Sequence, residues 1–339
     1  MIVLLLPLVV AILFIDYFRP FDKSYSKTPV RPFQEQLYQR LADAGLTGDE
    51  LATTGALTLG YKEDLDRELK RHFQTSGAAH ILAVSGLHTG IIYGLLLCLL
   101  TLGGRHKPLH DNLLRRWLLS SVIIAAMWGY AWLTGMTPSV VRAVVMVTIF
   151  EIGRMAYRQA FSLNTIAAAA VLILLVRPQD LWNISFQLSF AATASIVVIA
   201  YAMGPTIQYR KIRRTLPGKI YNWFIGIIIV SIAAQLGTLP ITIFYFKQVS
   251  TYFLLANLIV LPIASLLVPC GLISIVLGGS APGILFSKVT WSLAWAMNHS
   301  VKWIEHLPGS TIPASANVWM VGIYYVLLLG FFIFLEKKH

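Results

Sequence analysis

The sequence predicts an all-α protein, a polytopic transmembrane helical bundle of about 8–10 spans with a small external amphipathic helical insert. Of its 339 residues, 57% are hydrophobic and only 12% are charged, and the mean hydropathy is +0.69. Soluble domains carry about twice that charged fraction. Several apolar runs also reach the ~20 residues that a helix needs to cross a bilayer. These observations exclude an ordinary soluble enzyme.

The apolar runs define the predicted elements. They lie at about 2–15, 78–103, 117–133, 138–152, 161–176, 181–203, 220–246, 251–277, 283–304 and 317–335. The first is short and is followed at once by Asp16, and Lys288, His299 and Lys302 dilute the ninth, so we expect the other eight to cross. The predicted organisation is a short first membrane segment at 1–15, the external insert at 16–77, a transmembrane core at 78–335 and a cytoplasmic tail at 336–339.

The distribution of basic residues predicts the orientation. If the loop at 104–116 is cytoplasmic, strict alternation places thirteen Lys/Arg residues on its side and only Arg177 and Lys247 on the other. Cytoplasmic loops are enriched in Lys and Arg. This pattern puts residues 16–77 outside and the C-terminus inside, provided that both unassigned runs cross.

The external insert has helical signals of its own. Residues 33–41 carry apolar side chains at helical spacing, and Thr47 and Glu50 have the spacing of a capping box. Residues 65–73 form an amphipathic stripe that stops at Gly77. The last helix is compatible with lying on the membrane surface or with packing on the bundle.

The segment from His80 to Gly90 carries unusual polar residues at the start of a predicted intramembrane helix. Histidines at membrane depth are costly unless they face protein or water, so they are candidates for a functional site. At 100° per residue, His80, Ser85 and His88 fall on one side of that helix. Two interpretations stay open, histidines satisfied inside the bundle and polar groups that line a pathway.

Three glycines recur on the opposite side of the same helix. They are Gly86, Gly90 and Gly94. Small residues at this spacing let membrane helices approach closely. We therefore expect this face to pack against a neighbouring helix.

An intramembrane enzyme is a rival interpretation of the same segment. Ser85 and His88 are three residues apart, close enough for a hydrogen bond between a nucleophile and a base. His80 and His88 are about 12 Å apart along a helix and cannot share a metal, and no H-E-x-x-H motif occurs. We predict no catalytic residue, no metal and no cofactor, and keep the enzyme as the alternative.

A second polar cluster surrounds a predicted helix start at the outer surface. Thr137 suits the N-cap position and Pro138 the first helical position. The free N–H groups and the dipole of such a helix start favour an anion. Arg142, about one turn inside, is placed to contact a phosphate; the alternative is an arginine that snorkels to the interface.

Amide side chains form the remaining polar candidates. They are Asn183, Gln187, Gln235 and Asn257. The first two are one turn apart, and Ala191 and Ala194 continue their face as a small, packable surface. The last two precede Pro240 and Pro262, which should interrupt helical hydrogen bonding where a cavity or a neighbouring helix satisfies the freed groups.

These segments resemble, in order, the motifs of the ComEC-type competence (DNA-uptake) channel family, in its transmembrane core region. His80–Gly90 is similar to H-L-L-A-x-S-G-L-H-x-G, and Pro138–Ala143 to P-S-x-x-R-A. Asn183–Phe190 is similar to x-x-F-Q-L-S-F, and Ala256–Pro262 to A-N-L-x-x-x-P. The resemblance runs from about residue 55 to 277. The family's OB-like and metallo-β-lactamase-like domains are not visible, so we expect the channel core alone.

The resemblance implies an inner-membrane channel of a bacterial cell that conducts single-stranded DNA into the cytoplasm during natural transformation. Single-stranded DNA and membrane lipids are the implied partners. A DNA receptor outside, a cytoplasmic ATP-driven motor and a nuclease would be separate proteins, because the sequence has no Walker-type loop and no nuclease domain. A homo-oligomer stays open. A small-solute transporter is a further alternative, against which no internal repeat is evident.

Overall fold

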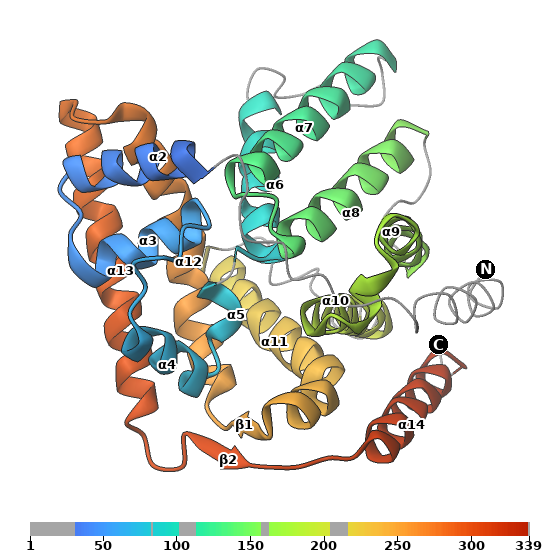
Figure 1. Cartoon of the computed structure of the whole chain (residues 1–339). Coiled ribbons are helices and arrows are strands. Elements are labelled where there is room, and N and C mark those ends of the chain that lie inside the picture. Colours follow the sequence, from blue (N-terminus) through green and yellow to red (C-terminus); the bar gives the residue numbers. More distant parts are fainter. Residues whose placement is uncertain (1–30, 83, 102–112, 157–162, 204–215, 338–339) are drawn as a thin grey trace.

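The computed structural model describes residues 31–82, 84–101, 113–156, 163–203 and 216–337 (Figure 1). The expected first membrane segment at 1–15 lies outside the described residues. The part that is described is almost entirely helical, which confirms the all-α class.

The helices follow one another along the chain with short connections. The N-terminal ones are α2 (Arg31–Asp43), α3 (Gly48–Thr58), α4 (Arg67–Ser76), α5 (Ala79–Leu82), α6 (Gly86–Thr101), α7 (Leu113–Leu133) and α8 (Pro138–Met155). They are followed by α9 (Leu163–Val176), the 3₁₀ helix η1 (Pro178–Trp182), α10 (Ile184–Met203), α11 (Leu216–Phe246), α12 (Phe253–Leu277), α13 (Ala281–Glu305) and α14 (Val318–Lys337). Two short strands, β1 (Gln248–Ser250) and β2 (Thr311–Pro313), pair antiparallel.

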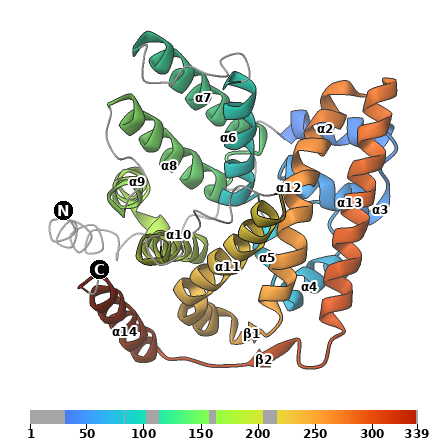
Figure 2. The same cartoon turned by 180° about the vertical axis from the view of Figure 1, so that it is seen from behind.

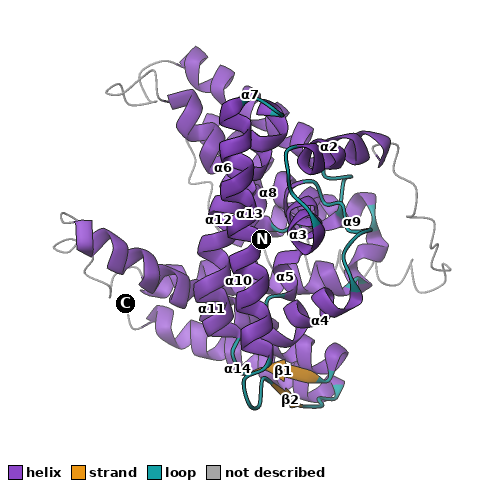
Figure 3. Ribbon diagram, turned by 90° about the vertical axis from the view of Figure 1, so that its left-hand side faces the viewer, coloured by secondary structure: helices purple, strands orange, loops and turns teal. Residues whose placement is uncertain are grey.

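The helices gather in groups. Long helices α12 and α13 run side by side with α2, α3 and α4 packed along them, while α6, α7 and α8 form a second group (Figure 1). Helices α10 and α11 pack against each other, and an extended stretch after β2 leads to α14 (Figure 2). The strand pair lies at one end of the molecule (Figure 3).

The number of membrane spans is confirmed only in part. Among the described residues, the helices at Tyr221–Phe246 and Phe253–Leu277 are long and apolar enough to cross a membrane. The apolar helices α6 and α9 have 16 and 14 residues. At ~1.5 Å per residue they measure about 24 and 21 Å, short of the ~30 Å hydrocarbon core.

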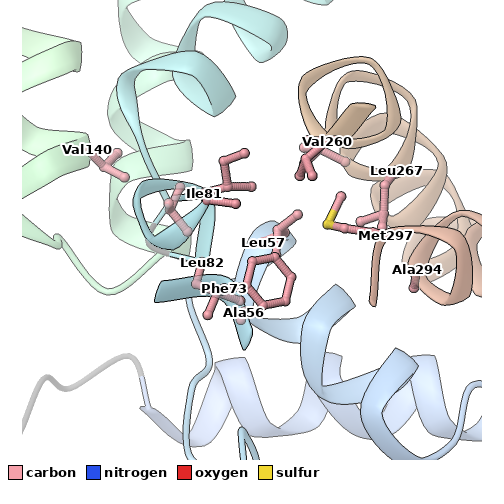
Figure 4. Close-up of a cluster of buried hydrophobic side chains, with 14 of the residues drawn as sticks. Ala56, Leu57, Phe73, Ile81, Leu82, Val140, Val260, Leu267, Ala294 and Met297 are labelled. Carbon is pink, nitrogen blue, oxygen red and sulfur yellow. The ribbon is translucent and has the colours of Figure 1, made fainter. Parts of the chain in front are cut away.

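Residues 31–76 are helical as expected, yet they are part of the core instead of a separate appendage. Side chains from α3, α4, α12 and α13 meet in one cluster, which includes the fully buried Leu57, Phe73 and Leu267 (Figure 4). The small residues of α3 explain the close packing, since a Cβ at Gly271 of α12 would lie 2.7 Å from Thr58. Each fully buried large apolar side chain contributes about 1.5–3 kcal/mol.

The predicted signals for helix ends have mixed outcomes in this segment. Asp66 caps α4 by accepting a hydrogen bond from the Glu68 N–H at 3.3 Å, and Gly77 ends the helix with a φ of 89°. This confirms the predicted stop. Thr47 occupies the N-cap position of α3 but makes no side-chain capping bond.

One cluster around α2 conflicts with the predicted alternation. Leu37, Tyr38 and Leu41 of α2 pack with Leu133, the last residue of α7, and with Ile275 near the end of α12. The alternation places the end of α7 outside and the end of α12 inside. The structure brings both ends to the same short helix.

Candidate functional site

The segment from His80 to Gly90 is a broken helix and not the continuous one that we expected. Helix α5 ends at Leu82 and α6 begins at Gly86. The prediction that His80, Ser85 and His88 share one helical face therefore does not hold, because the 100° rule requires a continuous helix. His80 is exposed in α5, whereas His88 is fully buried in the first turn of α6.

Ser85 and His88 together cap α6. The Ser85 N–H donates to Nδ1 of His88 at 3.1 Å, and Ser85 Oγ lies 2.9 Å from the same nitrogen. This is the geometry of a capping box in which an imidazole replaces the usual glutamate. An Nδ1 that accepts a backbone hydrogen bond assigns the neutral ring's proton to Nε2, which is buried with no hydrogen-bond partner among the described residues.

Arg142 is the buried cation at the start of α8. It is 2% exposed, so it does not snorkel to an interface. Its Nη2 donates to Ser139 Oγ at 3.2 Å and to Ser185 Oγ at 2.8 Å. Its Nε and Nη1 have no hydrogen-bond partner in the part of the chain that the structure describes. Thr137 precedes α8 as predicted, but its side chain makes no capping bond.

The starts of three helices meet around Arg142. Ser139 and Ser185 each occupy the second position of their helix, α8 and α10, and their Oγ atoms are 3.4 Å apart. Gly86 begins α6 beside α8, since a Cβ built on it would lie 3.9 Å from that of Ala143. Helix starts carry positive dipole ends, and Asp180 of η1 is near enough for its charge to interact favourably with Arg142. The segments around residues 85, 140 and 185 are thus one polar site.

The amides of the third segment satisfy local backbone groups. Asn183 precedes α10 as its cap and accepts the Ser185 N–H at 2.9 Å. Gln187 donates to the Leu181 carbonyl at 3.0 Å. The predicted shared face of Asn183 and Gln187 is not observed, because Asn183 lies outside the helix. Gln235 is half-buried in α11, and Asn257 is buried in α12 with its Oδ1 lacking a partner among the described residues.

Helix α11 continues through Pro240, and α14 satisfies the groups that the proline leaves free. Proline cannot donate to the carbonyl four residues earlier, here that of Leu236. Tyr324 donates to this carbonyl at 2.9 Å, and Tyr325 donates to the Gly237 carbonyl at 2.7 Å. This confirms, at Pro240, that a neighbouring helix satisfies the interrupted hydrogen bonding.

The glycines of α6 do not make the close helix contact that we expected. A Cβ built on Gly90 or Gly94 would meet no atom within 4 Å, so this face is open. The tight approach occurs instead at Gly237, where a Cβ would lie 2.5 Å from the Ala191 carbonyl oxygen of α10. Ala191 belongs to the small surface predicted for that helix.

Sequence reasoning missed a charged network at the other end of α8. Glu151, fully buried, accepts from the Tyr93 hydroxyl at 2.7 Å and pairs with Arg154 at 2.8 Å. Arg154 Nη2 also contacts Ser120 Oγ at 3.2 Å. The network joins α6, α7 and α8. The signal was present, since Glu151 is a lone acidic residue within an apolar run.

No group of three or more His, Cys, Asp or Glu side chains in the described ranges is placed to hold a metal ion. The polar site consists instead of hydroxyl, amide and guanidinium groups. Such groups donate hydrogen bonds to oxyanions.

Comparisons with known proteins cover most of the chain. A family described as Competence protein matches residues 57–338. ComE operon protein 3 of Bacillus subtilis (strain 168) is 27% identical over 293 residues, 84% of this chain and 34% of that protein. Recombination protein 2 of Haemophilus influenzae is 28% identical over 245 residues, 70% of this chain and 29% of that protein. YcaI, an uncharacterized protein of Escherichia coli (strain K12), is 28% identical over 245 residues, 70% of this chain and 30% of that protein.

The chain spans about a third of the length of these relatives. No solved structure matches it significantly. The family match contains the three segments that meet at Arg142 and extends almost to the C-terminus. The chain therefore belongs to the competence protein family.

Proposed function

We propose that this chain is the membrane part of an inner-membrane channel that conducts single-stranded DNA into the cytoplasm during natural transformation. The observation that carries the proposal is the meeting of three motif segments at one cationic site around Arg142. Membership of the competence family supports a role in DNA uptake. The relatives are longer, so the activity of the whole protein enters only through this proposal.

The chemistry of the site suits a strand that passes through without being read. A guanidinium, hydroxyls and helix starts interact with phosphates, and backbone phosphates are the same for every base. In the proposal, Thr137 and Arg142 contact the backbone. The residues proposed to line the rest of the path are His80, Ser85, His88, Asn183, Gln187, Gln235 and Asn257. A receptor outside the cell, a cytoplasmic ATP-driven motor and a separate nuclease would complete the uptake machinery.

Reconstitution of the purified chain in lipid vesicles tests this function. Labelled single-stranded DNA should become protected from an external nuclease only in vesicles that contain the protein. An uncharged peptide nucleic acid of the same length and sequence is the matched cargo control, and it should stay outside. Failure of DNA to enter under an imposed inward gradient, or equal entry of both polymers, would remove the channel proposal.

An intramembrane hydrolase is a second candidate, favoured by the 2.9 Å separation of Ser85 Oγ and His88 Nδ1. In the structure the Ser85 N–H uses the same nitrogen lone pair, so the imidazole serves the helix cap instead of a nucleophile. A serine-directed fluorophosphonate probe distinguishes the two. Labelling that disappears in Ser85→Ala would support the hydrolase, and no labelling is expected of the channel.

A further inference from the structure

The first turns of α8 and α10 present two serine hydroxyls to one guanidinium. Ser139 and Ser185 both accept from Arg142 Nη2, so each hydroxyl hydrogen remains available to donate elsewhere. Their Oγ atoms are 3.4 Å apart, and a bond between them would use only one of the two hydrogens. Ser185 is exposed and Ser139 is half-buried. At least one hydroxyl that is polarised by a cation is therefore free to bind a group that arrives from outside.

Arg142 itself lacks the partners that a buried cation needs. Its Nε and Nη1 are buried with no hydrogen-bond acceptor among the described residues, although the side chain is 2% exposed. A buried charge that is incompletely paired is unfavourable, and a bound anion offsets that cost. The side chain reaches back along α8 to Ser139, toward the N–H groups of the helix start. The charge and the free helix-start donors thus occupy the same place.

Asp180 is the negative charge that now faces this site. It lies in η1, just before α10, and its charge interacts favourably with Arg142. No hydrogen bond between the two is found in the part of the chain that is described, and Asp180 is half-exposed. It acts as a distant counter-ion, which an arriving anion must displace or oppose.

From this geometry we infer that the starts of α6, α8 and α10 form a binding site for a tetrahedral oxyanion of the phosphate class. Ser139 and Ser185 contact its oxygens, and Arg142 supplies the charge behind them. Gly86 keeps the third helix start open beside Ala143. The assignment of that phosphate to a DNA backbone rests on the proposed function, whereas the oxyanion site stands on the geometry alone.

Direct binding measurements on the purified full chain in detergent test the site. The probes are inorganic phosphate and a fluorescent single-stranded oligothymidylate. Arg142→Gln should weaken binding of both by about ten-fold or more, and Ser185→Ala by about 2–10-fold, as expected for lost charged and neutral hydrogen bonds. Asp180→Asn should tighten binding several-fold, because it removes the opposing charge. Lys288→Gln on α13, an exposed residue with the same charge change, should alter neither.

The variants make failure visible even if Arg142→Gln does not fold. Unchanged binding of both probes by Ser185→Ala and Asp180→Asn would overturn the site. Opposite shifts for phosphate with no shift for the oligonucleotide would keep the oxyanion site and assign it to free phosphate. Expected binding shifts without translocation in vesicles would keep the site and remove the channel. Weakening by Lys288→Gln equal to that by Arg142→Gln would show non-specific attraction and overturn the site.

Discussion

At the scale of single residues, His88 has a structural task that can be measured. Its ring accepts the Ser85 N–H and so satisfies a group at the start of α6. We expect His88→Ala to lower the free energy of unfolding by about 1 kcal/mol, the usual value of an N-terminal cap. Ser85→Ala should cost less, because the backbone N–H remains. Denaturant unfolding in detergent measures both, and a larger loss in Ser85→Ala would contradict the capping assignment.

Glu151 and Arg154 form the second residue-scale case. Glu151→Gln leaves Arg154, which is 24% exposed, without its counter-ion. Breaking a buried pair costs about 3–5 kcal/mol, and the partial exposure of Arg154 reduces the expected loss to about 2 kcal/mol. The double variant Glu151→Gln/Arg154→Gln should recover part of the stability. A double-mutant cycle gives the coupling, and strictly additive losses would show that the pair contributes nothing.

At the scale of elements, the glycines of α6 and α11 exchange their expected roles. A leucine at Gly237 would collide with the Ala191 backbone of α10, so we expect Gly237→Leu to destabilise the protein by at least ~1–3 kcal/mol. Gly90→Leu meets open space and is the matched control, expected to fold normally. Thermal unfolding in detergent compares the two. Equal destabilisation would mean that the open face of α6 is covered in the functional protein.

The contact between α11 and α14 is a second property of elements. Tyr325→Phe leaves the Gly237 carbonyl without the Tyr325 hydroxyl as its donor. We expect a loss of about 1 kcal/mol, the net value of one hydrogen bond, and faster proteolysis at the connection before α14. Tyr221→Phe, an exposed residue on α11, is the control. Identical protease sensitivity of the two variants would show that the hydroxyl does not hold α14.

The elements also show what the sequence could and could not predict. The start of α8 after Thr137, the stop at Gly77 and the interruption at Pro240 follow from local chemistry, and each was predictable. The break between α5 and α6 was not, because an apolar run without proline reads as one helix. The joining of Arg142 to Ser185 depends on tertiary packing across 43 residues, which periodicity cannot show.

At the scale of the whole molecule, composition predicted the class and failed on the arrangement. Charge density marked residues 31–76 as external, since Arg, Lys, Asp and Glu avoid hydrocarbon. The structure instead buries α3 between α12 and α13 through the small residues Ala52 and Ala56. The average charge of a segment hides such a short uncharged stretch, so its packing into the core could not be read from composition.

The two helix ends that share the cluster around α2 test the topology of the whole chain. Leu133 of α7 and Ile275 of α12 both pack on this 13-residue helix. A helix of that length measures about 20 Å, less than the ~30 Å hydrocarbon core. Both ends therefore lie on one side of the membrane, and the alternation of basic loops breaks between them.

We accordingly expect a cysteine at Gly279, just after α12, to react from the same side as one at Gln39 of α2, and from the side opposite to one at Ala156 after α8. All three positions are exposed, and a Cβ at Gly279 meets no atom within 4 Å. Cys98 and Cys270 are first replaced by alanine, and the cysteine-free chain is the control. An impermeant maleimide is then applied to intact and to permeabilised cells. Labelling of Gly279→Cys together with Ala156→Cys would restore the alternation, and it would mean that α2 does not pack on the end of α12 in the membrane.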